Sequence, residues 1–142
     1  MILPDVNVLV YAFRRDSEDH LAYLEWLEDI VNSNSQYGFS DLALSGMLRI
    51  VTHPRVFNKP SSLTDSLGFV RQLRGQPNCL NITPGDRHWD IFEELTQSVN
   101  ARGNLLPDAW FAALAIEHGC EWITTDHDFS RFEGLNWRHP LR

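Results

Sequence analysis

The sequence has few cysteines, a single lysine and no long apolar run, and most of these shortages exclude a class of protein. Cys79 and Cys120 belong to no Cys-X-X-Cys or Cys/His spacing, so neither a zinc site nor a disulfide framework is indicated. No apolar run approaches the ~20 residues that span a bilayer, and the start lacks a basic leader with a cleavage site. We therefore expect a cytoplasmic protein without a membrane segment. The formal charge of −7 argues against a protein that coats nucleic acid through a broad basic surface.

The composition that is present is that of one compact domain. With 142 residues and 43% hydrophobic content, the chain can bury a single core, and we expect one domain over residues 1–142. The segment ILPDVNVLVYAF predicts a buried strand that ends near Asp5, and CLNIT and EWITT predict two further short strands. Helical spacing predicts helices after Ser17, from Ser40 or Asp41 to residue 51, over 63–73, over 89–99 and over 107–119. This alternation favours an α/β fold with a mostly parallel central sheet covered by helices.

Three acids stand at boundaries between the expected elements. Asp5 follows the first strand, Asp108 starts the alanine-rich helix, and Asp126 follows the EWITT strand. In open α/β sheets, strand ends and helix starts meet in one crevice, so acids distant in sequence can converge there. Carboxylates that converge repel one another, and a divalent cation removes that conflict. Mg²⁺ prefers such oxygen ligands, so the pattern predicts a magnesium site.

The chemistry that such a site supports is hydrolysis of a phosphodiester. A divalent metal lowers the pKa of a bound water and stabilises charge on the attacked phosphate, so no side-chain nucleophile is needed. The sequence accordingly contains no Gly-X-Ser-X-Gly elbow, no His-Glu-X-X-His pair and no phosphate-binding Walker loop.

A family resemblance rests on three segments taken together. PDVNVLVYAF, GNLLPDAWFAALAIEHG and WITTDHDFSRF resemble, in order and separation, the motifs of PIN-domain proteins, specifically the VapC toxins, over nearly the whole chain. The resemblance implies a three-layer α/β/α PIN domain that cleaves RNA, with tRNA or rRNA as target class, using Mg²⁺ or Mn²⁺. It also implies a homodimer, inhibition by a VapB-type antitoxin, and operator DNA binding only through the antitoxin complex.

The resemblance assigns roles to individual acids. It makes Asp5, Asp108 and Asp126 catalytic and metal-binding, with Asp128 as a further metal-site acid. Each also has an ordinary structural interpretation. Asp108 suits a helix N-terminus, and Asp126 and Asp128 suit a turn.

The fourth catalytic acid departs from the VapC pattern. VapC proteins usually carry a Glu in the helix after the second strand, where this sequence offers Leu44. Asp41, one helical turn earlier, is the only acid in that segment, so we expect it to be the replacement. Asn7 and Asn104 are expected to hydrogen-bond the carboxylates or their bound waters.

Other polar and aromatic residues are further candidates for RNA contacts. His127 either binds metal or phosphate or points outward, whereas His88 and His118 are expected at the surface or at helix ends. The tryptophans in helices are expected to pack in the core or in a dimer. The candidates for phosphate contacts are basic residues, although most surface arginines are only solvated: Arg14, Arg15, Arg49, His53, Arg55, Arg87 and Arg102.

Two alternative functions remain open at the level of sequence. A PIN-fold protein with a weakened metal site would bind antitoxin or nucleic acid without cleaving it. A phosphotransfer enzyme also opens with an Asp after its first strand. A dehalogenase-type phosphatase needs a second acid where Asn7 stands, and a response-regulator receiver needs paired acids and a later lysine. The lone Lys59 lies in a proline-containing loop, so both phosphotransfer types fit poorly.

Overall fold

The computed structural model describes all residues from 1 to 142. Strands and helices alternate along the chain, as the sequence predicts. The strands are β1 (Ile2–Pro4), β2 (Tyr37–Phe39), β3 (Cys79–Asn81), β4 (Glu121–Ile123) and β5 (Trp137–Arg138). The helices are α1 (Val6–Phe13), α2 (His20–Val31), α3 (Asp41–Val51), α4 (Leu63–Arg74), α5 (His88–Val99), α6 (Leu105–His118) and the short 3₁₀ helix η1 (His127–Arg131).

All strand pairs are parallel, which brings the carboxyl ends of the strands to one edge. β4 pairs with both β1 and β5, and β2 pairs with β3. The two groups lie side by side, because a Cβ added at Gly38 of β2 would lie 3.6 Å from the carbonyl oxygen of Ile2 in β1. Asp5, Asp126 and the start of η1 therefore all follow strands at the same edge.

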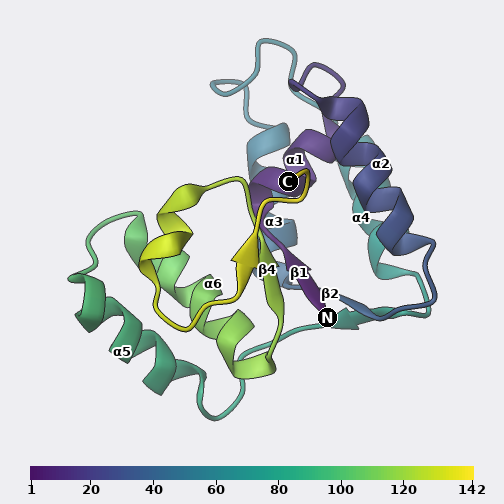
Figure 1. Cartoon of the computed structure of the whole chain (residues 1–142). Coiled ribbons are helices and arrows are strands. Elements are labelled where there is room, and N and C mark those ends of the chain that lie inside the picture. Colours follow the sequence, from purple (N-terminus) through teal and green to yellow (C-terminus); the bar gives the residue numbers. More distant parts are fainter.

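Helices cover both faces of the sheet, giving three layers. One core cluster contains Leu3 and Trp122 of the strands and the buried residues of α6. A second contains Phe39 and Ile123 of the strands with buried residues of α1, α2, α3 and α4. Figure 1 shows α5 and α6 on one side and α2 and α4 on the other. The predicted α/β/α architecture is confirmed. None of the helices has both the length and the apolar character that spanning a membrane requires.

The opening strand ends where the sequence predicts, beside Asp5, but the helix that follows it was not predicted. The strand stops at Pro4, and the valine-rich residues that follow form helix α1, with four of its eight residues buried. Alternating valines favour a strand locally. Here the Asp5 side chain caps a helix by accepting the Val6 N–H at 2.6 Å, and packing on both sides makes the helix apolar over most of its surface.

Two further local features were not predicted. Tyr37, Gly38 and Phe39 form β2, although the sequence there indicates only the end of a helix, because three residues are too few to show strand alternation. Helix α2 begins at His20 rather than just after Ser17, and Leu21 is 76% exposed instead of packing inward.

Candidate active site

Asp5 is the buried centre of the carboxylate group. It follows β1, its N–H donates to the carbonyl of Ile123 in β4 at 2.8 Å, and the residue is only 7% exposed. Its Oδ1 caps α1, while Oδ2 accepts hydrogen bonds from Thr124 Oγ1 at 2.7 Å and from Asn7 Nδ2 at 3.4 Å. All of these donors are neutral, so the carboxylate is oriented without being paired with a cation.

Thr124 connects two of the acids, and sequence reasoning missed it. Its fully buried hydroxyl donates to Asp5 and accepts the N–H of Asp126 at 3.0 Å. Asn7 completes the link, because its Oδ1 accepts the N–H of Thr125 at 3.4 Å. The signal was available: a buried polar hydroxyl at a strand end, two residues before an acid, needs a hydrogen-bond partner.

Asp108, Asp126 and Asp128 converge on the same edge as Asp5. Asp126 caps η1, and its Oδ1 accepts the N–H of Asp128 at 2.9 Å. Asp108 lies in the first turn of α6 and is half-buried. Burial, followed by the charges of Asp126, Asp5 and Asp128, raises the pKa of Asp108 to about 6. The structure therefore brings these four predicted acids within electrostatic range of one another.

The negative charge of this acid cluster, Asp5, Asp108, Asp126 and Asp128, is not neutralised within the chain. None of the four belongs to an ion pair. Burial raises the pKa of Asp5 to about 6, and the charge of Asp126 adds to that, against the opposing hydrogen bonds from Thr124 and Val6. Clustered carboxylates with raised pKa values in a protein indicate a functional site, in this case one that attracts cations.

Two other predicted site residues lie apart from the cluster. Asp41 starts α3 and is exposed, where its carboxylate pairs with Arg74 Nε at 3.4 Å and accepts from Asn81 Nδ2 at 3.3 Å. These partners belong to the β3 side of the sheet, and Asp41 does not contribute to the raised pKa of Asp5 or Asp108. Asn104 precedes α6, is exposed and makes no side-chain hydrogen bond to any acid.

Comparisons with known proteins identify the family. The PIN domain model matches residues 2–135. Over 141 residues the chain is 43% identical to Ribonuclease VapC43 of Mycobacterium tuberculosis, covering 99% of this chain and 96% of that protein. Ribonuclease VapC33 of the same organism is 38% identical over 142 residues, covering 100% and 99%. The chain belongs to the VapC family of PIN-domain ribonucleases.

A solved structure shares the VapC fold of this chain. A chain in the crystal structure of VapBC2 from Rickettsia felis, bound to a DNA fragment from its promoter, superimposes with a TM-score of 0.68 at 18% identity. The match covers 98% of both chains. The family assignment removes the phosphotransfer alternatives, which belong to other folds.

The α3 helix of this VapC protein offers no carboxylate to the cluster. Leu44 stands where VapC proteins usually carry a Glu; it is 3% exposed and packs in the core with residues of α1. Near Asp5, α3 presents Gly46, where an added Cβ would lie 3.1 Å from Val6 Cγ2. Asp41 is the only acid in α3, and it pairs with Arg74.

The oxygen donors of the acid cluster suit a hard divalent cation, but they do not form a complete set of direct ligands. No three His, Cys, Asp or Glu side chains in the chain are arranged to hold a metal ion directly. Mg²⁺ typically takes one or two carboxylates and keeps several waters, so a cluster of uncompensated oxygens satisfies its needs without three direct ligands. Asp5, Asp108 and Asp126 are therefore the residues suited to hold such an ion.

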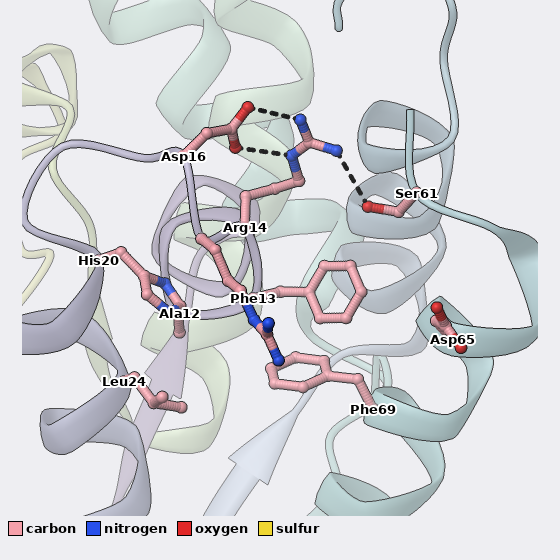
Figure 2. Close-up of a pocket in the computed structure, with 10 residues that line it drawn as sticks. Ala12, Phe13, Arg14, Asp16, His20, Leu24, Ser61, Asp65 and Phe69 are labelled. Atoms are coloured by element: carbon pink, nitrogen blue, oxygen red, sulfur yellow. Dashed lines mark hydrogen bonds and ion pairs between the residues drawn. The ribbon is translucent and has the colours of Figure 1, made fainter. Parts of the chain in front are cut away.

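A wide cavity lies at the opposite end of α1 from Asp5. It measures about 740 Å³ and contains none of the clustered acids. Figure 2 shows its apolar floor of Phe13, Leu24 and Phe69, with Arg14 held at its edge by Asp16 and Ser61. Arg14, predicted as a phosphate contact, is 9% exposed and engaged inside the protein. This cavity lies about 12 Å along the helix from the acids, which places it outside the candidate active site.

Three further residues from the sequence analysis are placed by the structure. His88, expected at the surface or at a helix end, lies at the start of α5 but is 3% exposed, and its Nε2 lies 3.0 Å from the carbonyl of Trp110. Arg87 is tied to the end of α6 by a bond to the carbonyl of Glu117. His127 points outward and packs edge-on against Trp137, with ring centroids 5.6 Å apart.

Proposed function

We propose that this VapC protein is a metal-dependent endoribonuclease that hydrolyses phosphodiester bonds at the acid cluster, with tRNA or rRNA as the target class. The observation that carries the proposal is the group of four acids at one sheet edge with no cation among them. The curated relatives named ribonucleases support the reaction class.

The acids of the cluster are held in place by different parts of the fold. Asp5 is buried and held by Thr124 and the α1 N-terminus, so it is the fixed point of the cluster. Asp126 is tied to the same hydroxyl through its backbone N–H, which fixes its distance from Asp5. Asp108 approaches from α6, on the other layer. Hydrogen bonds that orient carboxylates in this way pre-organise them for the ion and the substrate.

The proposed cofactor is Mg²⁺ or Mn²⁺, held by Asp5, Asp108 and Asp126, with Asp128 nearby. When bound, such an ion supplies a more acidic water and stabilises charge on the attacked phosphate. Raised pKa values at Asp5 and Asp108 mean that protons compete with the ion, so activity should fall as pH drops through about 6.

The deciding experiment is cleavage of total RNA by purified, antitoxin-free protein with Mg²⁺ or Mn²⁺, and with EDTA as a control. Asp5→Asn and Asp108→Asn should each reduce cleavage by about 10² to 10³-fold, because each removes a charge that the site uses. Asp41→Asn is the matched control. Its partners are Arg74 and Asn81, so it should retain cleavage within about twofold. Intact RNA with both metals, or equal loss in all three variants, would contradict the proposal.

A non-catalytic binding protein is the second candidate, and two observations favour it. No three ligating side chains converge to hold an ion, and α3 brings no acid to the cluster. In that case the protein would bind antitoxin or nucleic acid without metal-dependent turnover. Intact RNA in the cleavage assay would lead to this assignment.

We propose that the protein binds a VapB-type antitoxin and a second copy of itself. The structural neighbours include VapBC complexes, some with promoter DNA, which supports a VapB-type antitoxin and operator binding through the antitoxin complex. A homodimer is proposed as well, and exposed apolar side chains such as Trp89, 63% exposed, offer surface for it. Light scattering of the protein alone, and again with a co-expressed antitoxin, tests both assemblies.

A further inference from the structure

The chain end after β5 lies beside the acid cluster. β1, β4 and β5 are adjacent and parallel, with Pro4 level with Ile123 and Ile123 level with Arg138. One residue further on, Asp5, Thr124 and His139 therefore stand in a row across the carboxyl edge. Thr124 confirms the closeness, because its N–H donates to the carbonyl of Arg138 at 3.1 Å while its hydroxyl donates to Asp5. Neighbouring strands are about 4.8 Å apart and β4 lies between β1 and β5, so the backbone of His139 is roughly 10 Å from that of Asp5.

His139 is held rigidly at this position. Its ring packs against Tyr23 of α2, with centroids 6.3 Å apart, and Tyr23 packs against Tyr11 of α1 at 5.1 Å. The next residue, Pro140, is buried. The N–H of Leu141 donates to His139 Nδ1 at 3.1 Å, which leaves Nε2 as the nitrogen that carries the proton. Burial, then Arg142 and His127, lower the pKa of His139, which favours the neutral ring with its proton on Nε2.

Two basic side chains, Arg142 and His127, lie close enough to His139 to act on its ring electrostatically. The charge of Arg142 acts to lower the pKa of both Tyr23 and His139, and Arg142 belongs to no ion pair. His127 follows Asp126 and is exposed on the neighbouring strand end. Arg138, which precedes His139, is paired with Glu121, so Arg142 is the arginine of this chain end that is left without an acidic partner. Glu18 and Asp19 are the acids on the Tyr23 side. Free donors next to uncompensated carboxylates are what a phosphate chain needs in order to approach them.

We propose that His139, Arg142 and His127 form a rim that binds the phosphate backbone of an RNA strand next to the acid cluster. The inference rests on the proposed ribonuclease function and names the residues that hold its substrate. His139 donates Nε2–H to a phosphate oxygen, and Arg142 supplies the charge. The contact is to the backbone, so it adds affinity without selecting a base.

Binding of a fluorescently labelled single-stranded RNA, followed by anisotropy in EDTA and again in Ca²⁺, tests the rim. His139→Phe keeps a ring against Tyr23 but removes the donor, so binding should weaken about tenfold. His139→Gln restores an N–H near the Nε2 position and should bind within about threefold of the unaltered protein. Arg142→Gln should weaken binding and reduce the slope of log Kd against log salt by about 0.7, the value for one phosphate on a single strand.

His118→Phe is the control. His118 ends α6 just before β4 begins, at the opposite edge of the sheet from the acids, and its Nε2 lies 2.7 Å from the carbonyl oxygen of Thr83. RNA binding by this variant should be unchanged. Equal affinity for all variants, equal loss in His118→Phe, or no RNA binding by the unaltered protein would overturn the rim. Binding is measured separately from cleavage, so the binding result holds even if the protein is an inactive nuclease. If the unaltered protein cleaves RNA but the His139 and Arg142 variants bind RNA as well as it does, the rim is wrong and the ribonuclease function stands.

Discussion

A buried charged side chain lies at each end of helix α1, and the two differ in whether an oppositely charged partner neutralises them. At the C-terminal end, Arg14 is 9% exposed, donates twice to Asp16, and also donates to the carbonyl of Lys59 and the hydroxyl of Ser61. Its guanidinium also lies 3.8 Å from the centre of the Phe57 ring. At the N-terminal end, Asp5 is equally buried but has neutral donors and acidic neighbours.

The difference separates a structural charge from a functional one. A buried charge with its full set of partners joins segments, and Arg14 joins the end of α1 to the loop before α4. A buried charge left without a counterion costs stability, and a protein keeps it where a ligand supplies the missing charge. Substitutions at either end of α1 therefore test this difference.

The largest effect is expected at the compensated end. Arg14→Ala removes four hydrogen bonds and the packing on Phe57, and it should lower the free energy of unfolding by about 3 kcal/mol. The neighbouring Arg15 is exposed, so Arg15→Ala should change it by less than about 0.5 kcal/mol. Urea unfolding measures both, and similar values for the two variants would erase the contrast.

The uncompensated end should respond with the opposite sign. The pKa of Asp5 rises from 3.8 to about 6 on folding, so the folded protein binds the proton more tightly and loses stability as pH rises through that interval. In EDTA, Asp5→Asn should therefore stabilise the protein at pH 8 by about 2 kcal/mol. The gain should disappear near pH 3, below the pKa of 3.8 in the unfolded chain, because Asp5 is then protonated in both states. Urea unfolding at the two pH values decides, and destabilisation at pH 8 would contradict the account.

Thr124 tests whether a neutral donor orients Asp5. Thr124→Val keeps the shape but removes the hydroxyl, so it should reduce RNA cleavage about tenfold and move the acidic limb of the pH profile upward, because the hydrogen bond lowers the pKa of Asp5. Thr124→Ser should restore both. The rate–pH profile of the three proteins is the measurement, and identical behaviour of Val and Ser would remove Thr124 from the site.

The smallest effect separates the two predicted asparagines. Asn7 contacts Asp5 and Thr124 at 3.4 Å, so Asn7→Ala should reduce cleavage about threefold. Asn104 is exposed and makes no such contact, so Asn104→Ala should cleave at the unaltered rate. Initial rates at saturating RNA compare them, and an Asn104→Ala defect as large as that of Asn7→Ala would show that distance from Asp5 is the wrong criterion.

Some elements could be predicted from the sequence because their signals are local. The alanine-rich helix, its Gly119 end and the EWITT strand follow from spacing and capping residues alone. The acids Asp5, Asp108 and Asp126 were found because each stands where one element changes into another. Helix α1 was missed because its valines favour a strand, and only packing on two sides makes them helical.

The sequence by itself determined the alternating α/β order, the family and the acids that follow strands, because these depend on neighbours along the chain. The tertiary structure decided which side chains meet. It placed Asp41 opposite Arg74, joined Asp5 to Thr124 across 119 positions, and set His139 level with both through the register of β4 and β5. Such partners are fixed by how strands line up at one edge, and that alignment depends on the whole core rather than on any local pattern.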